Sequence, residues 1–139
     1  DGRDVQAELA AISITPIEDR LGHYLTTELE FAFKGGGSVG PPRYKLMIAV
    51  RERVQAPLID TIAGRASAGT VMVDADYKLV SLAGGEPLAN GVAFTMATYD
   101  RSGQRFANIR AARDAEIRDA KALADQIRTR IAAAFASRR

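Results

Sequence analysis

The stretch Val71–Leu79, with sequence VMVDADYKL, sets an apolar side chain at every second position. This two-residue period is typical of a β-strand that buries one face. Tyr44–Val54 and Gly91–Tyr99 alternate in the same way on either side of it. Turn sequences separate the three stretches, at Pro57–Gly64 and at residues 84–87, GGEP. Because short turns join antiparallel strands, the sequence predicts a three-stranded antiparallel meander.

An amphipathic helix is expected before the meander, because Leu21, Leu25, Leu29 and Phe33 recur every four residues. Thr15 is the predicted N-cap, with Pro16 in the first turn and Glu18 completing a capping box. Three glycines after Lys34 end this helix. The segment before it, Leu9–Ile14, is predicted to be a short strand.

The last third of the chain predicts one long helix over residues 106–137, with its apolar stripe formed by Ile117, Ala120, Ala124, Ile127, Ile131 and Ala134. The predicted order is therefore β-α-β-β-β-α within a single domain covering residues 1–139. The first β-α-β step favours a parallel pair. We expect an α+β fold, a two-layer sandwich with two helices packed on one face of a four-stranded mixed sheet. Its second face, with Lys45, Arg51, Asp74, Asp76 and Lys78, is left to meet water or a partner.

Composition excludes several classes of protein. The 139 residues include no cysteine and a single histidine, His23. Disulfide scaffolds, thiolate catalysis and Cys-ligated metals are therefore ruled out, and a His-based zinc site is disfavoured. No run approaches the roughly 18 apolar residues that cross a bilayer. We expect no metal and no cofactor.

Ser38 lies in a G-x-S-x-G pattern, at residues 36–40, like that of serine hydrolases. That motif requires a strand before the serine and a helix after it, whereas here a helix precedes the loop and a strand follows. A hydrolase using Ser38 is thus the weakest alternative. Asp74 and Asp76 share a strand face with Lys78, which favours a solvated surface over a cation site. No set of residues predicts an enzyme.

Charge is distributed unevenly along the chain. Residues 101–139 hold ten basic and four acidic residues, a net charge of +6, whereas residues 1–100 carry −4. A basic segment of this kind indicates either an anionic partner, such as nucleic acid, a membrane surface or an acidic glycolipid, or simply a solvated helix face. Arginine predominates, and its forked guanidinium binds phosphate well.

Several short motifs occur in a defined order. Ile14-Thr15-Pro16-Ile17 runs into Arg20-Leu21-Gly22-x-x-Leu25, and Tyr44-x-Leu46 opens the second strand. Ala75-x-Tyr77-x-Leu79 follows on the third strand. The chain closes with Asp114-Ala115-x-x-Arg118 and Leu123-Ala124-x-x-Ile127. Together with the order of elements, these motifs resemble LptE, the lipopolysaccharide-assembly lipoprotein family, in its alphaproteobacterial form.

The resemblance implies a non-enzymatic lipoprotein of the outer membrane that faces the periplasm. Such a protein plugs the LptD β-barrel, assists its assembly and binds lipopolysaccharide, and no nucleic acid is expected as a partner. The lipid anchor requires an N-terminal cysteine, so the resemblance implies that the anchor segment has been trimmed from this chain. A barrel plug should have a polar surface of mixed charge.

Family members contact lipopolysaccharide through basic residues at two places, the turn leading into the third strand and the start of the last helix. In this sequence the resemblance assigns those places to Arg65 and Arg110, and Arg101 and Arg105 extend the group. The alternative is a general α/β module for another anionic ligand, such as nucleic acid. Interleaved exposed aromatic residues, which would favour that alternative, are not expected, since most aromatics fall on predicted core faces.

Overall fold

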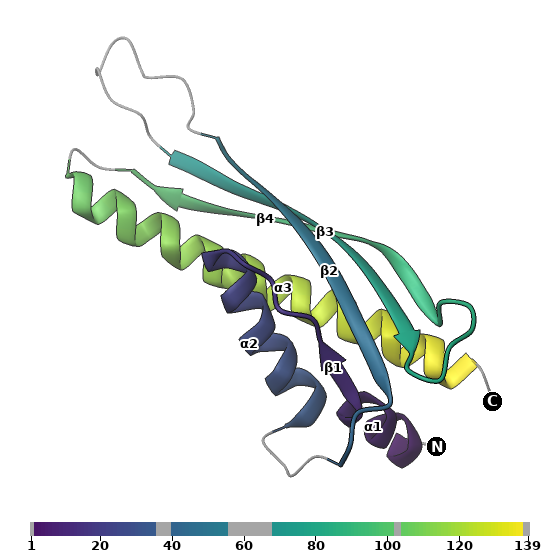
Figure 1. Cartoon of the computed structure of the whole chain (residues 1–139). Helices are drawn as coiled ribbons and strands as arrows, with labels where there is room; N and C mark the ends of the chain where they lie inside the picture. Colours follow the sequence, from purple (N-terminus) through teal and green to yellow (C-terminus); the bar gives the residue numbers. More distant parts are fainter. Residues whose placement is uncertain (1, 36–39, 56–67, 102–103, 138–139) are drawn as a thin grey trace.

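The structure, a computed structural model, describes residues 2–35, 40–55, 68–101 and 104–137. Helices and strands follow one another as α1, β1, α2, β2, β3, β4 and α3 (Figure 1). Their bounds are α1 Gly2–Ala10, β1 Ile12–Ile14, α2 Arg20–Lys34, β2 Tyr44–Gln55, β3 Ala68–Ser81, β4 Ala89–Asp100 and α3 Arg105–Ser137.

The four strands form one mixed sheet in the order β1-β2-β3-β4. β1 pairs with β2 in parallel, with Ile12 opposite Tyr44, and the pairing extends only to Leu46. β2 and β3 pair antiparallel along their length, with Arg51 opposite Asp74, and β3 and β4 do the same. The predicted parallel crossover and antiparallel meander are both confirmed. Each strand is one to three residues longer at its ends than the sequence pattern indicates, except β1, which is shorter.

The hydrophobic core lies between one face of the sheet and the two long helices α2 and α3, which lie on the same side of it (Figure 1). The predicted stripe of α2 is buried throughout, and so are alternate residues of β3. Among the largest fully buried side chains are Phe33, Leu21, Leu25, Leu29, Leu46, Leu79, Leu123, Ile127 and Ile131. The predicted two-layer α+β sandwich is therefore confirmed, with one face of the sheet left uncovered.

The helix α1 was not expected, and the strand predicted over Leu9–Ile14 is wrong in its first half. Leu9 belongs to α1 and is fully buried, and Val5, one turn earlier, packs against the same core. The carboxylate of Glu8 binds the hydroxyl of Tyr44 at the start of β2. Packing by two apolar side chains thus holds a helix that intrinsic propensity alone would leave marginal.

The N-cap of α2 is Asp19, so the predicted capping box at Thr15 is wrong. The side chain of Asp19 accepts a hydrogen bond from the backbone N–H of Gly22. Thr15 instead continues the line of β1, because its N–H donates to the carbonyl of Leu46 at 3.0 Å. The predicted end of the helix is confirmed, with Gly35 in the left-handed conformation at φ 59°.

The two candidate caps are distinguished by their effect on stability. Asp19→Ala should lower the free energy of unfolding by about 1 kcal/mol, because a Gly22 amide loses its acceptor. Thr15→Val should leave it unchanged or raise it, since the buried Thr15 hydroxyl has no hydrogen-bond partner among the described residues. Urea denaturation of both variants measures the difference. If Thr15→Val lowered the free energy of unfolding more than Asp19→Ala, Thr15 and not Asp19 would be the N-cap of α2.

Candidate functional site

Most arginines of the described residues are engaged by partners. Arg43 pairs with Glu8 at 3.2 Å, and Arg118 pairs with Asp114 at 3.1 Å, as its spacing of four residues on one helix predicts. Arg128 donates to the carbonyl of Ala32 at 3.2 Å. These side chains serve the fold, so their charge is largely compensated within the molecule.

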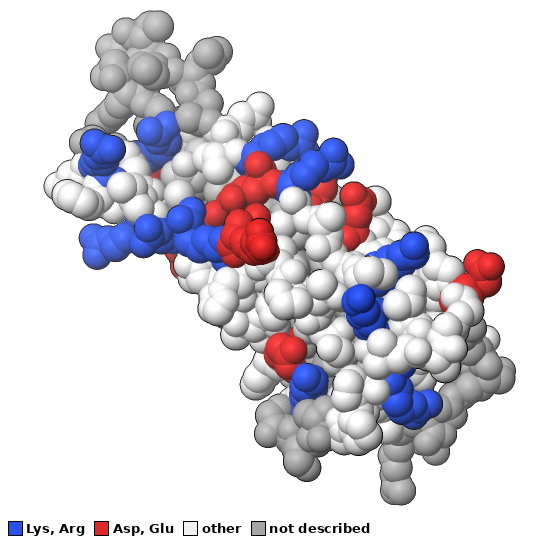
Figure 2. Space-filling model, viewed as in Figure 1, with Lys and Arg blue, Asp and Glu red and all other residues white. Residues whose placement is uncertain are grey.

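Four arginines around the start of α3 differ from the rest: Arg101, Arg105, Arg110 and Arg113. None of the four forms an ion pair with a carboxylate in the described part of the chain. All but Arg101 are exposed. Figure 2 shows basic side chains at the end of the molecule where α3 begins. We call these four residues the arginine patch.

Two exposed apolar side chains accompany the arginine patch on the first two turns of α3. Phe106 is 80% exposed and Ile109 is 40% exposed. On a helix, residues three and four apart share a face, so Phe106, Arg110 and Arg113 line one side. Arg105 and Ile109 line the adjacent side. An apolar surface bordered by guanidinium groups is suited to an amphiphile with anionic groups, more than to a purely polar anion.

Of the four residues predicted to bind lipopolysaccharide, three lie together in the arginine patch: Arg101, Arg105 and Arg110. Their binding role stays a prediction. Arg65, the fourth, lies outside the described residues. Sequence reasoning missed Arg113, Phe106 and Ile109 as members of the same surface. Their spacing within residues 105–113 was the available signal, since it places apolar and basic side chains on adjacent faces of one helix.

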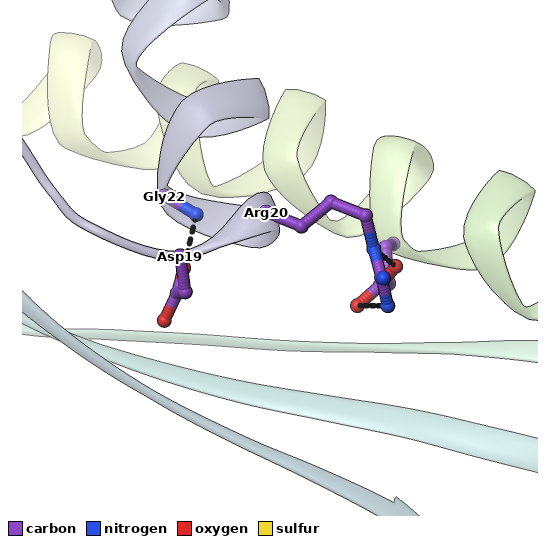
Figure 3. A network of polar contacts seen from close by, with 4 residues as sticks. Asp19, Arg20 and Gly22 are labelled. Atoms are coloured by element: carbon purple, nitrogen blue, oxygen red, sulfur yellow. Dashed lines mark hydrogen bonds and ion pairs between the residues drawn. The ribbon is translucent and has the colours of Figure 1, made fainter.

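A second group of charges lies between α2, α3 and the sheet, where Arg20 binds Glu116. The Arg20 guanidinium donates to both carboxylate oxygens of Glu116, with Nε–Oε1 at 2.9 Å and Nη2–Oε2 at 3.3 Å. Figure 3 shows Arg20 extending from the start of α2 toward α3, next to the Asp19 cap. Glu116 is only 3% exposed, so this forked ion pair compensates a buried charge.

The acidic neighbours of this ion pair have shifted pKa values. The pKa of Glu52 is raised to about 8. Loss of solvent contact is the largest cause, and a hydrogen bond with Glu116 and repulsion from its charge add to it. The pKa of Glu116 is lowered: burial opposes the shift, while hydrogen bonds from Glu52 and Arg20 and the Arg20 charge outweigh it. The opposite directions of these two shifts place the negative charge of the pair on Glu116, next to Arg20.

Asp119, one turn beyond Glu116 on α3, is the least compensated charge of the fold. It is 1% exposed, and among the described residues only the side chain of Thr95 on β4 lies near enough to act as a weak hydrogen-bond partner of its carboxylate. Burial raises its pKa to about 6; the Glu116 charge adds to the shift, while the Arg118 charge and a hydrogen bond with Thr95 oppose it. A buried group of this kind is a cost to folding at neutral pH.

The uncovered face of the sheet carries both charges and apolar side chains. Arg51 and Arg53 share the single carboxylate of Asp74, at 3.9 and 3.4 Å. On β4 the exposed row is apolar and is formed by Val92, Phe94 and Met96. Most aromatic side chains are buried in the core or packed against it, as the sequence predicts, and three are exposed: Phe31, Phe94 and Phe106. This face therefore has the mixed polarity of a surface that meets water or a partner.

Other candidate sites are weaker. His23 is exposed on α2, and no group of three metal-ligating side chains occurs among residues 2–35, 40–55, 68–101 and 104–137. Ser38 lies outside the described residues. None of the described helices is both long enough and apolar enough to cross a membrane.

The fold defines a class of small α+β domains in which two long helices cover one face of a four-stranded mixed sheet. The LptE family, described as lipopolysaccharide-assembly, matches residues 9–131. That range covers most of the chain, and the chain therefore belongs to the LptE lipopolysaccharide-assembly family. The family assignment and the envelope-lipoprotein character predicted from the sequence motifs are confirmed. No curated protein matches the chain.

Three solved structures share the fold. A candidate lipoprotein of Caulobacter crescentus CB15 is 25% identical, with a TM-score of 0.80 over 98% of both chains. A minor lipoprotein of Acinetobacter baumannii is 14% identical, with a TM-score of 0.62 over 88% of both chains. The rare lipoprotein B of Shewanella oneidensis is 13% identical, with a TM-score of 0.53 over 91% of this chain and 92% of its own.

Asp119 makes stability depend on pH in a defined direction. Its carboxyl titrates near 3.8 when unfolded and near 6 when folded, so the folded state binds more protons between these values. The free energy of unfolding should therefore fall as the pH rises from about 4 to about 6. Asp119→Asn should remove the Asp119 part of this slope, leaving the part that comes from the raised pKa of Glu52, and it should stabilise the protein at pH 7 by about 1–3 kcal/mol.

Urea denaturation across this pH range measures the slope, and Asp125→Asn, an exposed change on the same helix, is the matched control. The control should keep the wild-type profile. Equal profiles for wild type and Asp119→Asn would contradict a raised pKa at Asp119.

Proposed function

We propose that this chain is the lipoprotein partner of an LptD-like β-barrel at the periplasmic face of the outer membrane, where it binds lipopolysaccharide and assists assembly of the barrel. It carries out no catalytic step and uses no cofactor. A lipid anchor on the N-terminal side of residue 1 holds it at the membrane. Family membership supports the partner and the ligand, and the arginine patch is the observation that favours this chain's own contact with the ligand.

The chemistry of the ligand supports this assignment of the arginine patch. Lipopolysaccharide carries phosphates and acidic sugars on a lipid with several acyl chains. Guanidinium groups bind phosphate with two parallel hydrogen bonds, and Arg105 and Arg110 are exposed without a carboxylate partner among the described residues. Phe106 and Ile109 offer an apolar surface next to them for part of an acyl chain. Arg65 is included in the proposed site on the resemblance alone.

The two surfaces of the sandwich suggest how the protein lies within the barrel. Its uncovered sheet face combines charged pairs with the apolar row of β4, as a surface shielded by a partner would. The ion pairs on this face, such as Arg53 with Asp74, suit the polar lumen of a large barrel. We propose that this face contacts the barrel polypeptide, which leaves the start of α3 free for lipopolysaccharide.

Loss of two guanidinium groups should weaken lipopolysaccharide binding. Arg105→Gln combined with Arg110→Gln should raise the dissociation constant roughly tenfold or more, because each lost charge-assisted contact with phosphate is worth about 1–2 kcal/mol. Titration of the chain with lipopolysaccharide at two salt concentrations measures this. Lys121→Gln removes one exposed charge farther along α3 and should bind like wild type. Steeply salt-dependent binding to DNA, with none to lipopolysaccharide, would favour the nucleic-acid alternative.

The partner assignment is tested separately. The full-length protein, expressed with its cognate LptD, should co-purify with the barrel as a stable complex, since obligate partners bury large interfaces. Affinity purification through a tag on LptD, followed by size-exclusion chromatography, measures this. A correctly folded chain that never accompanies LptD would contradict the proposal.

A further inference from the structure

The two edges of the sheet are treated differently by the fold. The outer edge of β4 is occupied by side chains of α3 that bond its carbonyl groups. Arg118 donates to Thr98 at 2.9 Å, Gln126 to Phe94 at 2.9 Å and Arg130 to Val92 at 2.7 Å. Arg118 and Gln126 are eight residues apart on α3, and the carbonyls that they bond are four residues apart on β4. Gln126 and Arg130 are four residues apart, and their carbonyls are two residues apart. Side chains in this position obstruct the addition of another strand to β4.

The edge on the other side of the sheet has no strand partner among the described residues along most of β2. β1 pairs only with Tyr44–Leu46, and Figure 1 shows the rest of β2 without a neighbouring strand on that side. The N–H of Tyr44 and the carbonyl of Leu46 point toward β1, to Ala11 and Thr15. Because backbone groups alternate in direction along a strand, the outward groups beyond Leu46 are those of Ile48, Val50, Glu52 and Val54. No other described residue bonds them.

Charges beside this free edge favour an acidic partner. Arg51 and Arg53 project from the uncovered face of β2, and they share one carboxylate, that of Asp74. A shallow hollow lies there, lined by the same three residues and Glu52. A strand added to β2 would place its own side chains directly opposite Arg51 or Arg53, and carboxylates at those positions would complete the charge pairing.

A second copy of this chain fits the edge poorly. The antiparallel register that pairs the whole of residues 48–54 with the same residues of a second copy sets Arg51 opposite Arg51. Like charges directly opposite one another destabilise strand pairing. The edge therefore disfavours association with itself while its backbone groups remain open to a different strand.

We propose that residues 48–54 of β2 form a strand-docking edge, at which an extended segment of the partner polypeptide with acidic side chains adds to the sheet. The inference rests on the proposed function for the identity of that partner, the LptD-like polypeptide. The outward N–H and C=O groups supply the binding energy by β-augmentation, and the two arginines select acidic side chains. α3 confines this addition to one edge, because its side chains occupy the other.

Amide hydrogen exchange resolved by residue tests the proposal on the purified complex with cognate LptD. In the isolated chain the outward amides of Ile48, Val50, Glu52 and Val54 should exchange fast, while those of residues 47, 49, 51 and 53 are protected by β3. In the complex the outward amides should slow by at least about tenfold. A complex that forms without protecting them overturns the docking edge and leaves the proposed function intact, whereas no complex at all overturns both.

A proline variant provides a second measurement. Val54→Pro removes an outward N–H and leaves the bonds to β3 in place, so it should weaken LptD binding by about tenfold. Val54→Ala keeps the N–H and should stay within about threefold of wild type. Wild-type binding by both variants would overturn the proposal. Protection of the outward amides in the isolated chain that increases with protein concentration would also overturn it, because a second copy would then occupy the edge.

Discussion

The structure depends on the burial of one face of a four-stranded sheet beneath two helices. α2 and α3 supply the apolar stripes, and alternate residues of β3, such as Ala75 and Tyr77, supply the opposite layer. Hydrophobic burial of this kind is the dominant favourable term in folding. Because only two long helices are available, the other face of the sheet stays uncovered. The core that stabilises the fold therefore also creates the surface on which a partner can act.

Charged side chains have different effects in the interior of the protein, where they affect stability, and on its surface, where they can bind a ligand. Arg20 compensates the charge of the buried Glu116, while the buried Asp119 has no ion-pair partner among the described residues. Several arginines elsewhere bind carboxylates or carbonyls, whereas those of the arginine patch form no ion pair with a carboxylate of the described residues. Charge left uncompensated on a surface is available to a ligand, and charge left uncompensated in the interior is a cost. In this protein the two occur on the same helix, at Arg110 and at Asp119.

Sequence periodicity predicts the sheet and the long helices because burial imposes the periods directly. The strand around Val73 and the stripe from Leu21 to Phe33 are both recovered in this way. It fails at α1, where only Val5 and Leu9 carry the tertiary packing, and at the α2 cap, where Thr15 is held instead by β2. The charged group at Glu116 could not be predicted, since its members are distant in sequence. Net charge and the family resemblance predicted three members of the arginine patch, Arg101, Arg105 and Arg110, but not Arg113.

Membership of the LptE family, the arginine patch and the edge of β2 support one proposed account, in which a non-catalytic lipoprotein links lipopolysaccharide to its outer-membrane translocon. The most direct test is to deplete the protein from cells and follow newly made lipopolysaccharide to the surface. The account predicts that synthesis continues while surface lipopolysaccharide stops accumulating. Undiminished surface lipopolysaccharide after complete depletion would contradict it.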